Sequence, residues 1–183
     1  MRRLSIHPHL HDVFGEEQPP VYLAAIFLFG IGVAIAFAVL AMPVLSALPS
    51  WRAVLALILV VDIAAGCVAN FTPSTNDFYV ARPRNRWIFI AIHVHVVVMA
   101  LLLGTGVGPA VAVWAFTIAA AIAVNLLAGH SAQTFVGGLL LSVGLAGLPL
   151  LPDLSPALAG VFALFMLKVQ FSFAVDHYRN VSS

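Results

Sequence analysis

The sequence predicts an all-α membrane protein, a polytopic bundle of six transmembrane helices with both termini in the cytoplasm. Of its 183 residues, 62% are hydrophobic and only 8% are charged, whereas a soluble domain carries about 25% charged residues. The mean hydropathy is +1.07, so a water-soluble surface cannot be built from this composition. The apolar residues also fall into six long runs, each of roughly the 20 residues that cross the hydrocarbon core of a bilayer.

Residues 1–20 are predicted to form a retained cytoplasmic segment that rests on the membrane surface. Two arginines open the segment, but the apolar core of a signal peptide does not follow them at once. His7, His9 and His11 alternate along it, and Pro8 interrupts them. This spacing has no standard metal-ligand geometry, so we interpret the segment as a polar interfacial arm.

The transmembrane domain is predicted to cover residues 21–178, followed by a short cytoplasmic tail at 179–183. Its expected spans are residues 21–45, 51–71, 87–107, 109–129, 134–151 and 156–178. Turns such as A-L-P-S, G-V-G-P and L-P-D-L-S-P separate several of them. Such short turns require antiparallel neighbours, so we expect one compact bundle without a second domain.

The arginines indicate the orientation of the bundle. With six spans, both termini lie on one side, and that side holds Arg2, Arg3, Arg82, Arg84, Arg86 and Arg179. The other side holds Arg52. Because cytoplasmic loops carry the excess of Lys and Arg, we expect cytoplasmic termini and an integral protein of the bacterial inner membrane.

The polar side chains of the stretch 70–95 predict an anion site on the same side. Arginine donates to phosphate and carboxylate groups in a fixed fork, and amide side chains add further donors. The expected anion-binding residues are Arg82, Arg84, Arg86, Asn70 and Asn125. Membrane lipids and a lipid-like or anionic small molecule are the expected ligands. The net charge of +1 favours no nucleic-acid partner.

Three fragments of the sequence resemble parts of the type-2 phosphatidic acid phosphatase signature. They are A-R-P-R (81–84), A-G-H-S-A (128–132) and D-H-Y-R (176–179). The resemblance implies that Arg82 holds phosphate, that His130 is an acid and that His177 is a nucleophile. The signature's lysine before R-P, its S-R pair and its final Asp are missing, so we do not assign the chain to this family.

The residues themselves also point to His130 and His177 as catalytic candidates, with Asp176 beside them. Both histidines lie at the cytoplasmic ends of their predicted spans. Histidine exchanges protons near neutral pH and can also act as a nucleophile. Together with the arginines, these residues predict one shared polar site at the inner leaflet.

Two charges lie deep in the predicted spans. Asp62 is 11 residues from Trp51, and Lys168 is 12 residues from Pro156. At 1.5 Å per residue, both lie about 17 Å below the outer surface. Because an unpaired charge at this depth is costly, we predict that Asp62 and Lys168 form a buried pair.

Metal or haem binding stays open as a further interpretation. The candidate ligands are His93, His130 and His177, contributed by three different helices. On a helix, His93 and His95 point about 200° apart, so they are not expected to serve one metal together. His93 is expected to face the bundle interior.

Three functional classes remain at this point. The favoured one is an enzyme that acts on a lipid or prenyl substrate carrying phosphate at the inner leaflet. A small six-span transport or substrate-binding subunit is the second class, and its ligand pocket should open to the outer side. The third is an accessory subunit of a larger membrane complex, with or without a metal or haem, and a homo-oligomer also fits the small size.

Overall fold

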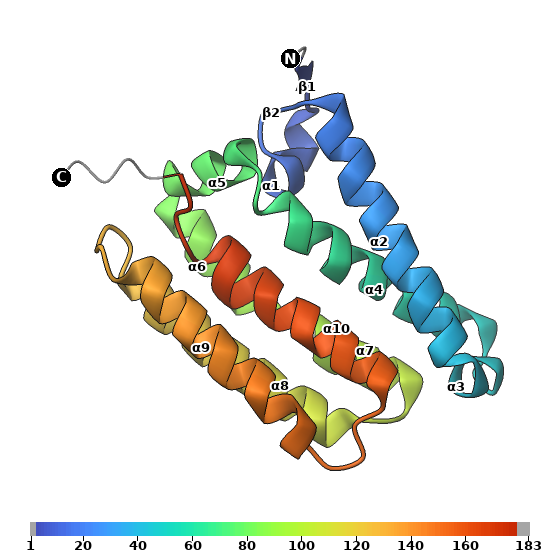
Figure 1. Ribbon diagram of the computed structural model, residues 1–183. Coiled ribbons are helices and arrows are strands. Elements are labelled where there is room, and N and C mark those ends of the chain that lie inside the picture. The colour runs from blue at the N-terminus through green and yellow to red at the C-terminus, as the bar shows by residue number, and fades with distance from the viewer. Residues whose placement is uncertain (1–2, 179–183) are drawn as a thin grey trace.

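The computed structural model describes residues 3–178, so Arg2, Arg179 and the predicted tail lie outside the described residues. The described chain is an all-α bundle (Figure 1). Six stretches are long and apolar enough to cross a membrane, which confirms the predicted six-span bundle. They are Pro20–Leu40, Ser50–Ala69, Pro83–Leu103, Val107–Leu126, Gln133–Leu150 and Pro156–Phe173. By length and composition, these are the helices of an integral membrane protein.

Several spans consist of more than one helical element. The α-helices are α1 (His11–Phe14), α2 (Pro20–Leu40), α3 (Met42–Ser46), α4 (Ser50–Ala69), α5 (Pro73–Val80), α6 (Pro83–Ile92), α7 (His95–Leu103), α8 (Val107–Leu126), α9 (Gln133–Gly147) and α10 (Pro156–Met166). Two short 3-10 turns, η1 (Pro8–Leu10) and η2 (Leu148–Leu150), and one π-helix, η3 (Leu167–Phe173), complete the list. The third span therefore joins α6 to α7, and the sixth joins α10 to η3.

The sixth span lies in the middle of the bundle. It packs against α4 on one side and against α8 and α9 on the other (Figure 1). α2 packs along α4 at one edge of the bundle, and α9 packs along α8 at the opposite edge. Phe162 and Phe165 of α10 are fully buried, as expected for the helix that has neighbours on several sides.

Prolines and hydroxyl side chains mark where helices begin. Proline occupies one of the first two positions of α2, α5, α6 and α10, where its missing N–H costs no hydrogen bond. At the start of α10, the Ser155 hydroxyl accepts a hydrogen bond from the Leu158 N–H. Pro83 therefore starts the third span at residue 83 instead of the expected 87.

The N-terminal segment forms a small hairpin. Strands β1 (Leu4–Ser5) and β2 (Glu17–Gln18) pair antiparallel, with η1 and α1 between them. The chain turns back at Gly15, whose φ of 72° lies in the left-handed region. A Cβ at Gly15 would lie 2.4 Å from the Ser74 carbonyl carbon, so the hairpin approaches α5 backbone to backbone.

Side-chain hydrogen bonds hold this hairpin on α5. The Tyr79 hydroxyl donates to the Asp12 carbonyl at 2.8 Å, and Gln18 Nε2 donates to Thr72 Oγ1 at 2.6 Å. Tyr178, at the other end of the described chain, donates its hydroxyl hydrogen bond to the Phe71 carbonyl. Both ends of the described chain thus meet the α4–α5 connection at one end of the bundle.

Candidate functional site

Several of the predicted site residues line two cavities, and the two cavities use different side chains of α6. We call the first the central cavity; it has a volume of about 330 Å³. Its lining includes Asp12, Asp62, Gly66, Asn70, Asn85, Ile88, Phe89, Ile92, His93, His95 and Lys168. We call the second the arginine cavity; it has a volume of about 370 Å³. Its lining includes Tyr79, Pro83, Arg86, Trp87, Asn125, Gly129 and Asp176.

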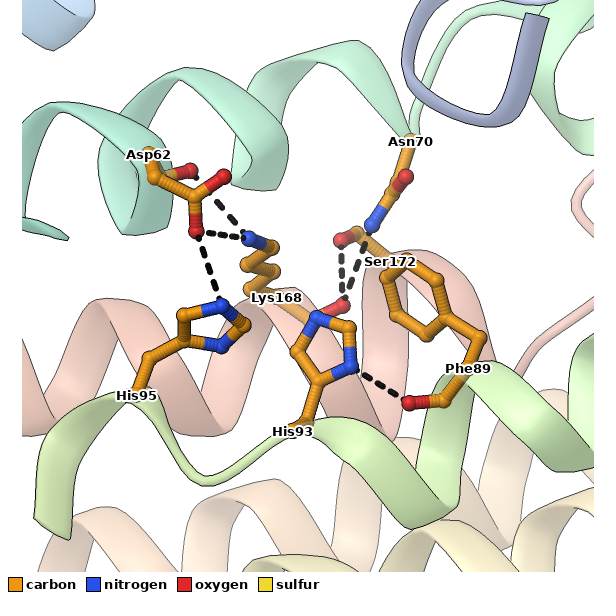
Figure 2. A network of polar contacts seen from close by, with 7 residues as sticks. All are labelled: Asp62, Asn70, Phe89, His93, His95, Lys168 and Ser172. Atoms are coloured by element: carbon orange, nitrogen blue, oxygen red, sulfur yellow. Dashed lines mark hydrogen bonds and ion pairs between the residues drawn. The ribbon is translucent and has the colours of Figure 1, made fainter. Parts of the chain in front are cut away.

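An ion pair joins α4 to η3 beside the central cavity (Figure 2). Lys168 Nζ lies 2.8 Å from Asp62 Oδ2 and also donates to the Asp62 carbonyl at 3.2 Å. The Lys168 side chain is 4% exposed, whereas the Asp62 side chain is 44% exposed. The carboxylate therefore faces the cavity, and it also neutralises an ammonium that is almost completely buried from solvent.

Gly66 makes room for the lysine. It lies one helical turn after Asp62 on α4 and also lines the cavity. A Cβ at this position would lie 2.6 Å from Lys168 Cε and 2.8 Å from Nζ. The close approach of the lysine to the α4 backbone therefore requires a residue without a side chain here.

Two histidines extend the charged group across the cavity wall (Figure 2). His95 Nε2 lies 3.7 Å from Asp62 Oδ2. The His93 and His95 ring centroids are 4.8 Å apart, and His93 Nδ1 contacts the Phe89 carbonyl oxygen at 2.5 Å. Lys168, Asp62, His95 and His93 therefore form one continuous series of titratable side chains.

A break in the third span brings the two histidines together. α6 ends at Ile92 and α7 begins at His95, with His93 at φ −78°, ψ 76° between them. The Val94 N–H bonds to the Ile92 carbonyl at 2.9 Å, which is not an α-helical bond. The expected separation of about 200° is therefore wrong, because it assumes a continuous helix.

The π-helix η3 positions the lysine from the opposite side of the cavity. Ser172 Oγ donates to the Lys168 carbonyl at 3.0 Å, and Asn70 Nδ2 donates to the same carbonyl at 3.4 Å (Figure 2). The wider turn leaves backbone groups that side chains then satisfy. Asn70, predicted to bind an anion, instead contacts backbone at the edge of the central cavity.

Arg86 occupies the second cavity with Asn125 and Asp176. The Arg86 side chain is buried, and its Nη2 donates to the Phe173 carbonyl at 3.3 Å. Asp176 is fixed by its backbone N–H, which donates to Gln133 Oε1 at 3.2 Å. Gln133 in turn donates to the Ala174 carbonyl at 3.0 Å, so a buried amide holds the turn after η3 in place.

The three arginines expected to act together are separated. Arg82 pairs with Glu16 of the hairpin at 2.9 Å, and its guanidinium lies 4.0 Å from the Phe78 ring centroid. Arg84 is exposed, and Arg86 alone of the three is buried. Arg82 precedes α6, while the side chains of Arg84 and Arg86 point to different faces of it, so no common clamp forms.

The predicted partnership of His130 and His177 is not supported by their surroundings. His130 is exposed in the turn before α9, where its Nδ1 accepts from the Ala132 N–H at 3.1 Å. His177 lies between Phe71 and Phe171, with ring centroids 5.0 and 5.3 Å away. Burial lowers the pKa of His177, partly offset by hydrogen bonds to backbone carbonyls.

The structure does not group His93, His130 and His177, the candidate metal ligands of the sequence analysis. Within residues 3–178, no group of three His, Cys, Asp or Glu side chains is arranged to hold a metal ion. His93 is buried in the third span, whereas the other two lie in turns at the end of the bundle. The three histidines therefore lie at different depths along the bundle.

His95 is the site residue that sequence reasoning missed. Its signal is the pair of histidines in H-V-H inside an otherwise apolar run. No protein-family model, curated protein or solved structure matches the chain.

Proposed function

We propose that this protein is a membrane-embedded enzyme that carries out acid–base chemistry on a lipid or prenyl substrate in the central cavity. The observation that carries the proposal is the position of Asp62. Its Oδ2 lies between the Lys168 ammonium at 2.8 Å and the His95 ring at 3.7 Å, and its side chain is open to the cavity. A carboxylate that an ammonium keeps ionised can hold a neighbouring histidine in position, and the histidine is then the group equipped to exchange a proton.

Access from the side supports a lipid-like substrate. Ile88 and Ile92 line the central cavity and are 50% and 60% exposed on the outer surface of the bundle. In a membrane, that surface contacts hydrocarbon. A molecule with an apolar tail can therefore approach Asp62 between these isoleucines while its tail remains among the lipids.

The charged residues divide the work as follows. His95 takes a proton from the polar group of the substrate, and the Asp62 carboxylate beside it stabilises the imidazolium that forms. The Lys168 ammonium offsets negative charge on the reacting group or on a phosphate that the substrate carries. His93 contacts both the His95 ring and the Phe89 carbonyl and so keeps His95 in position.

The end of the bundle that holds both chain ends is proposed to be cytoplasmic, in a bacterial inner membrane. The distribution of arginine supports this orientation. Arg3, Arg82, Arg84 and Arg86 lie at this end, whereas Arg52 lies in the first turn of α4 and donates to the Leu101 carbonyl at 2.6 Å at the other end. The central cavity then extends from the cytoplasmic half to mid-membrane.

Lipid analysis of cells that produce the protein tests the enzyme. We expect wild-type protein to deplete one lipid or prenyl species and to generate another, and we expect Asp62→Asn and His95→Gln to abolish the change. His130→Gln is the matched control, because this exposed histidine lies outside both cavities, and it should keep full activity. If the change in lipid composition persists in Asp62→Asn but disappears in His130→Gln, the active site lies at the end of the bundle near His130 and not in the central cavity.

Proton-coupled transport is the second candidate, and the interrupted helices favour it. The break at residues 93–94 and the π-helix at residues 167–173 both border the central cavity. Discontinuous helices near the middle of the membrane often form the binding sites of transporters. Liposomes with an imposed proton gradient separate the two functions, because a transporter dissipates the gradient when its ligand is added and an enzyme does not.

A further inference from the structure

Arg86 is a buried cation that forms no ion pair within residues 3–178. The residue is 4% exposed, and the one hydrogen bond of its side chain within residues 3–178 is the 3.3 Å contact of Nη2 with the Phe173 carbonyl. Its Nε atom is buried without a partner, and no carboxylate of residues 3–178 lies within 4.0 Å of the guanidinium. A buried guanidinium in a membrane span is costly unless an anion neutralises it.

Asp176 is the opposite charge in the same cavity. It is half-buried, and the contact that the described chain makes with its side chain is a 3.4 Å hydrogen bond from the Tyr178 N–H. Its backbone N–H donates to Gln133 Oε1 at 3.2 Å, which holds the Asp176 backbone in place beside the cavity. The cavity of about 370 Å³ therefore presents a cation and an anion that are too far apart to form an ion pair.

We propose that the arginine cavity binds a zwitterionic group in which a phosphate contacts Arg86 and a primary ammonium contacts Asp176. A purely anionic ligand would be repelled by Asp176, and a purely cationic one by Arg86. Phosphoethanolamine, free or as the head group of phosphatidylethanolamine, carries both charges and is small enough for a cavity of this volume. Asn125 adds an amide that can donate to phosphate oxygens.

The depth of the cavity fits a lipid head group. Arg86 is the fourth residue of the third span, and its neighbour Trp87 is 40% exposed. Tryptophan at the end of a span is typical of the level where head groups lie. Because different side chains of α6 line the central cavity, this binding site does not depend on the proposed enzymatic function.

Retention of lipids by the full-length protein tests the proposal. The protein is purified, equilibrated with an equimolar mixture of phosphatidylethanolamine, phosphatidylcholine and phosphatidylglycerol, and analysed by native mass spectrometry. We expect phosphatidylethanolamine to be retained on the order of tenfold over the other two, as one charge-assisted hydrogen bond predicts. Asp176→Asn should remove the preference over phosphatidylglycerol, and Arg86→Lys should lower retention of phosphatidylethanolamine. Arg84→Gln, in an exposed position of the same helix, should change neither.

A competition experiment separates the two sources of the ligand, the lipid head group and the free compound. If soluble phosphoethanolamine displaces the lipid at millimolar concentration, the head-group chemistry stands and the free compound is a ligand as well. Stronger retention of phosphatidylglycerol, equal retention of all three lipids, or an unchanged preference in Asp176→Asn would each overturn it. Asp176 lies outside the spans, so the Asp176→Asn variant should fold, which thermal unfolding in detergent verifies.

Discussion

At the scale of single residues, the Asp62–Lys168 pair is asymmetric. The lysine side chain is almost fully buried, while the aspartate side chain is nearly half exposed to the cavity. Removing the carboxylate leaves a buried ammonium, whereas removing the ammonium leaves a carboxylate that water or a ligand can still reach. The two charges therefore contribute unequally to stability, although they share one contact.

We expect Asp62→Ala to lower the thermal unfolding midpoint in detergent more than Lys168→Met does. Leaving a buried charge unpaired costs about 3–5 kcal/mol, and the exposure of Asp62 reduces the cost of the second variant. The double variant should recover part of the loss, because no unpaired charge remains. Fully additive losses would show that each charge has its own partner.

Gly66→Ala tests the space that the lysine needs. Its Cβ would lie 2.6 Å from Lys168 Cε, so the ammonium must move away from Asp62 at a cost of about 1–3 kcal/mol. Gly32→Ala is the matched control, because a Cβ at this helical glycine meets nothing within 4 Å. An equal unfolding midpoint for the two variants would mean that the lysine adjusts freely.

His177 should make stability depend on pH. Burial lowers its pKa in the folded chain below the value of 6.5 that an ordinary histidine has. The unfolded chain therefore binds a proton first as pH falls through about 6.5, and protonation favours unfolding. We expect the drop in unfolding midpoint between pH 7.5 and pH 5.5 to be smaller in His177→Phe than in wild type. The exposed His130→Gln variant should retain the full drop.

At the scale of elements, the N-terminal hairpin and the broken third span shape the central cavity. A prediction of six regular helices contains neither element. The hairpin covers α5 and contributes Asp12 to the wall of the central cavity. The break between α6 and α7 turns two histidines of one span toward one another. Both elements therefore supply cavity-lining side chains from positions where the regular helices are interrupted or absent.

Gly15→Ala should release the hairpin from α5. The substitution adds a Cβ that would lie 2.4 Å from the Ser74 backbone, and it strains a φ of 72°. Limited proteolysis should then cut within residues 3–18 faster than in wild type, while the six spans remain protected. Gly108→Ala, where a Cβ meets nothing within 4 Å, provides the comparison. Equal cleavage rates would indicate that the hairpin is not held by this contact.

At the scale of the whole molecule, the orientation in the membrane is open to a direct test. Reporter fusions after residue 183 and within the turn 150–156 should report opposite sides, with residue 183 in the cytoplasm. Reports from the same side would show that the sixth span does not cross and would contradict the six-span bundle, and a residue 183 outside the cytoplasm would reverse the proposed orientation.

Composition and hydrophobic run length were sufficient to predict the bundle, but not the two cavities. Equal depth and opposite charge suggest the pairing of Asp62 with Lys168, because both properties can be counted along the sequence. The role of His95 depends on a helix break that no proline or glycine marks. A prediction based on a regular period of 3.6 residues therefore places His95 on a different face from His93. Arg82, Arg84 and Arg86 are neighbours in sequence, but the start of α6 distributes them over separate surroundings.

If ligands enter between Ile88 and Ile92 as proposed, this route determines what the central cavity can select. The alkyl part of a ligand there stays in hydrocarbon, so seating it removes little apolar area from water. Acyl or prenyl length should then have little influence on affinity, and discrimination falls to the polar groups near Asp62. Such a protein would bind lipids with tails of many lengths but with few kinds of head group.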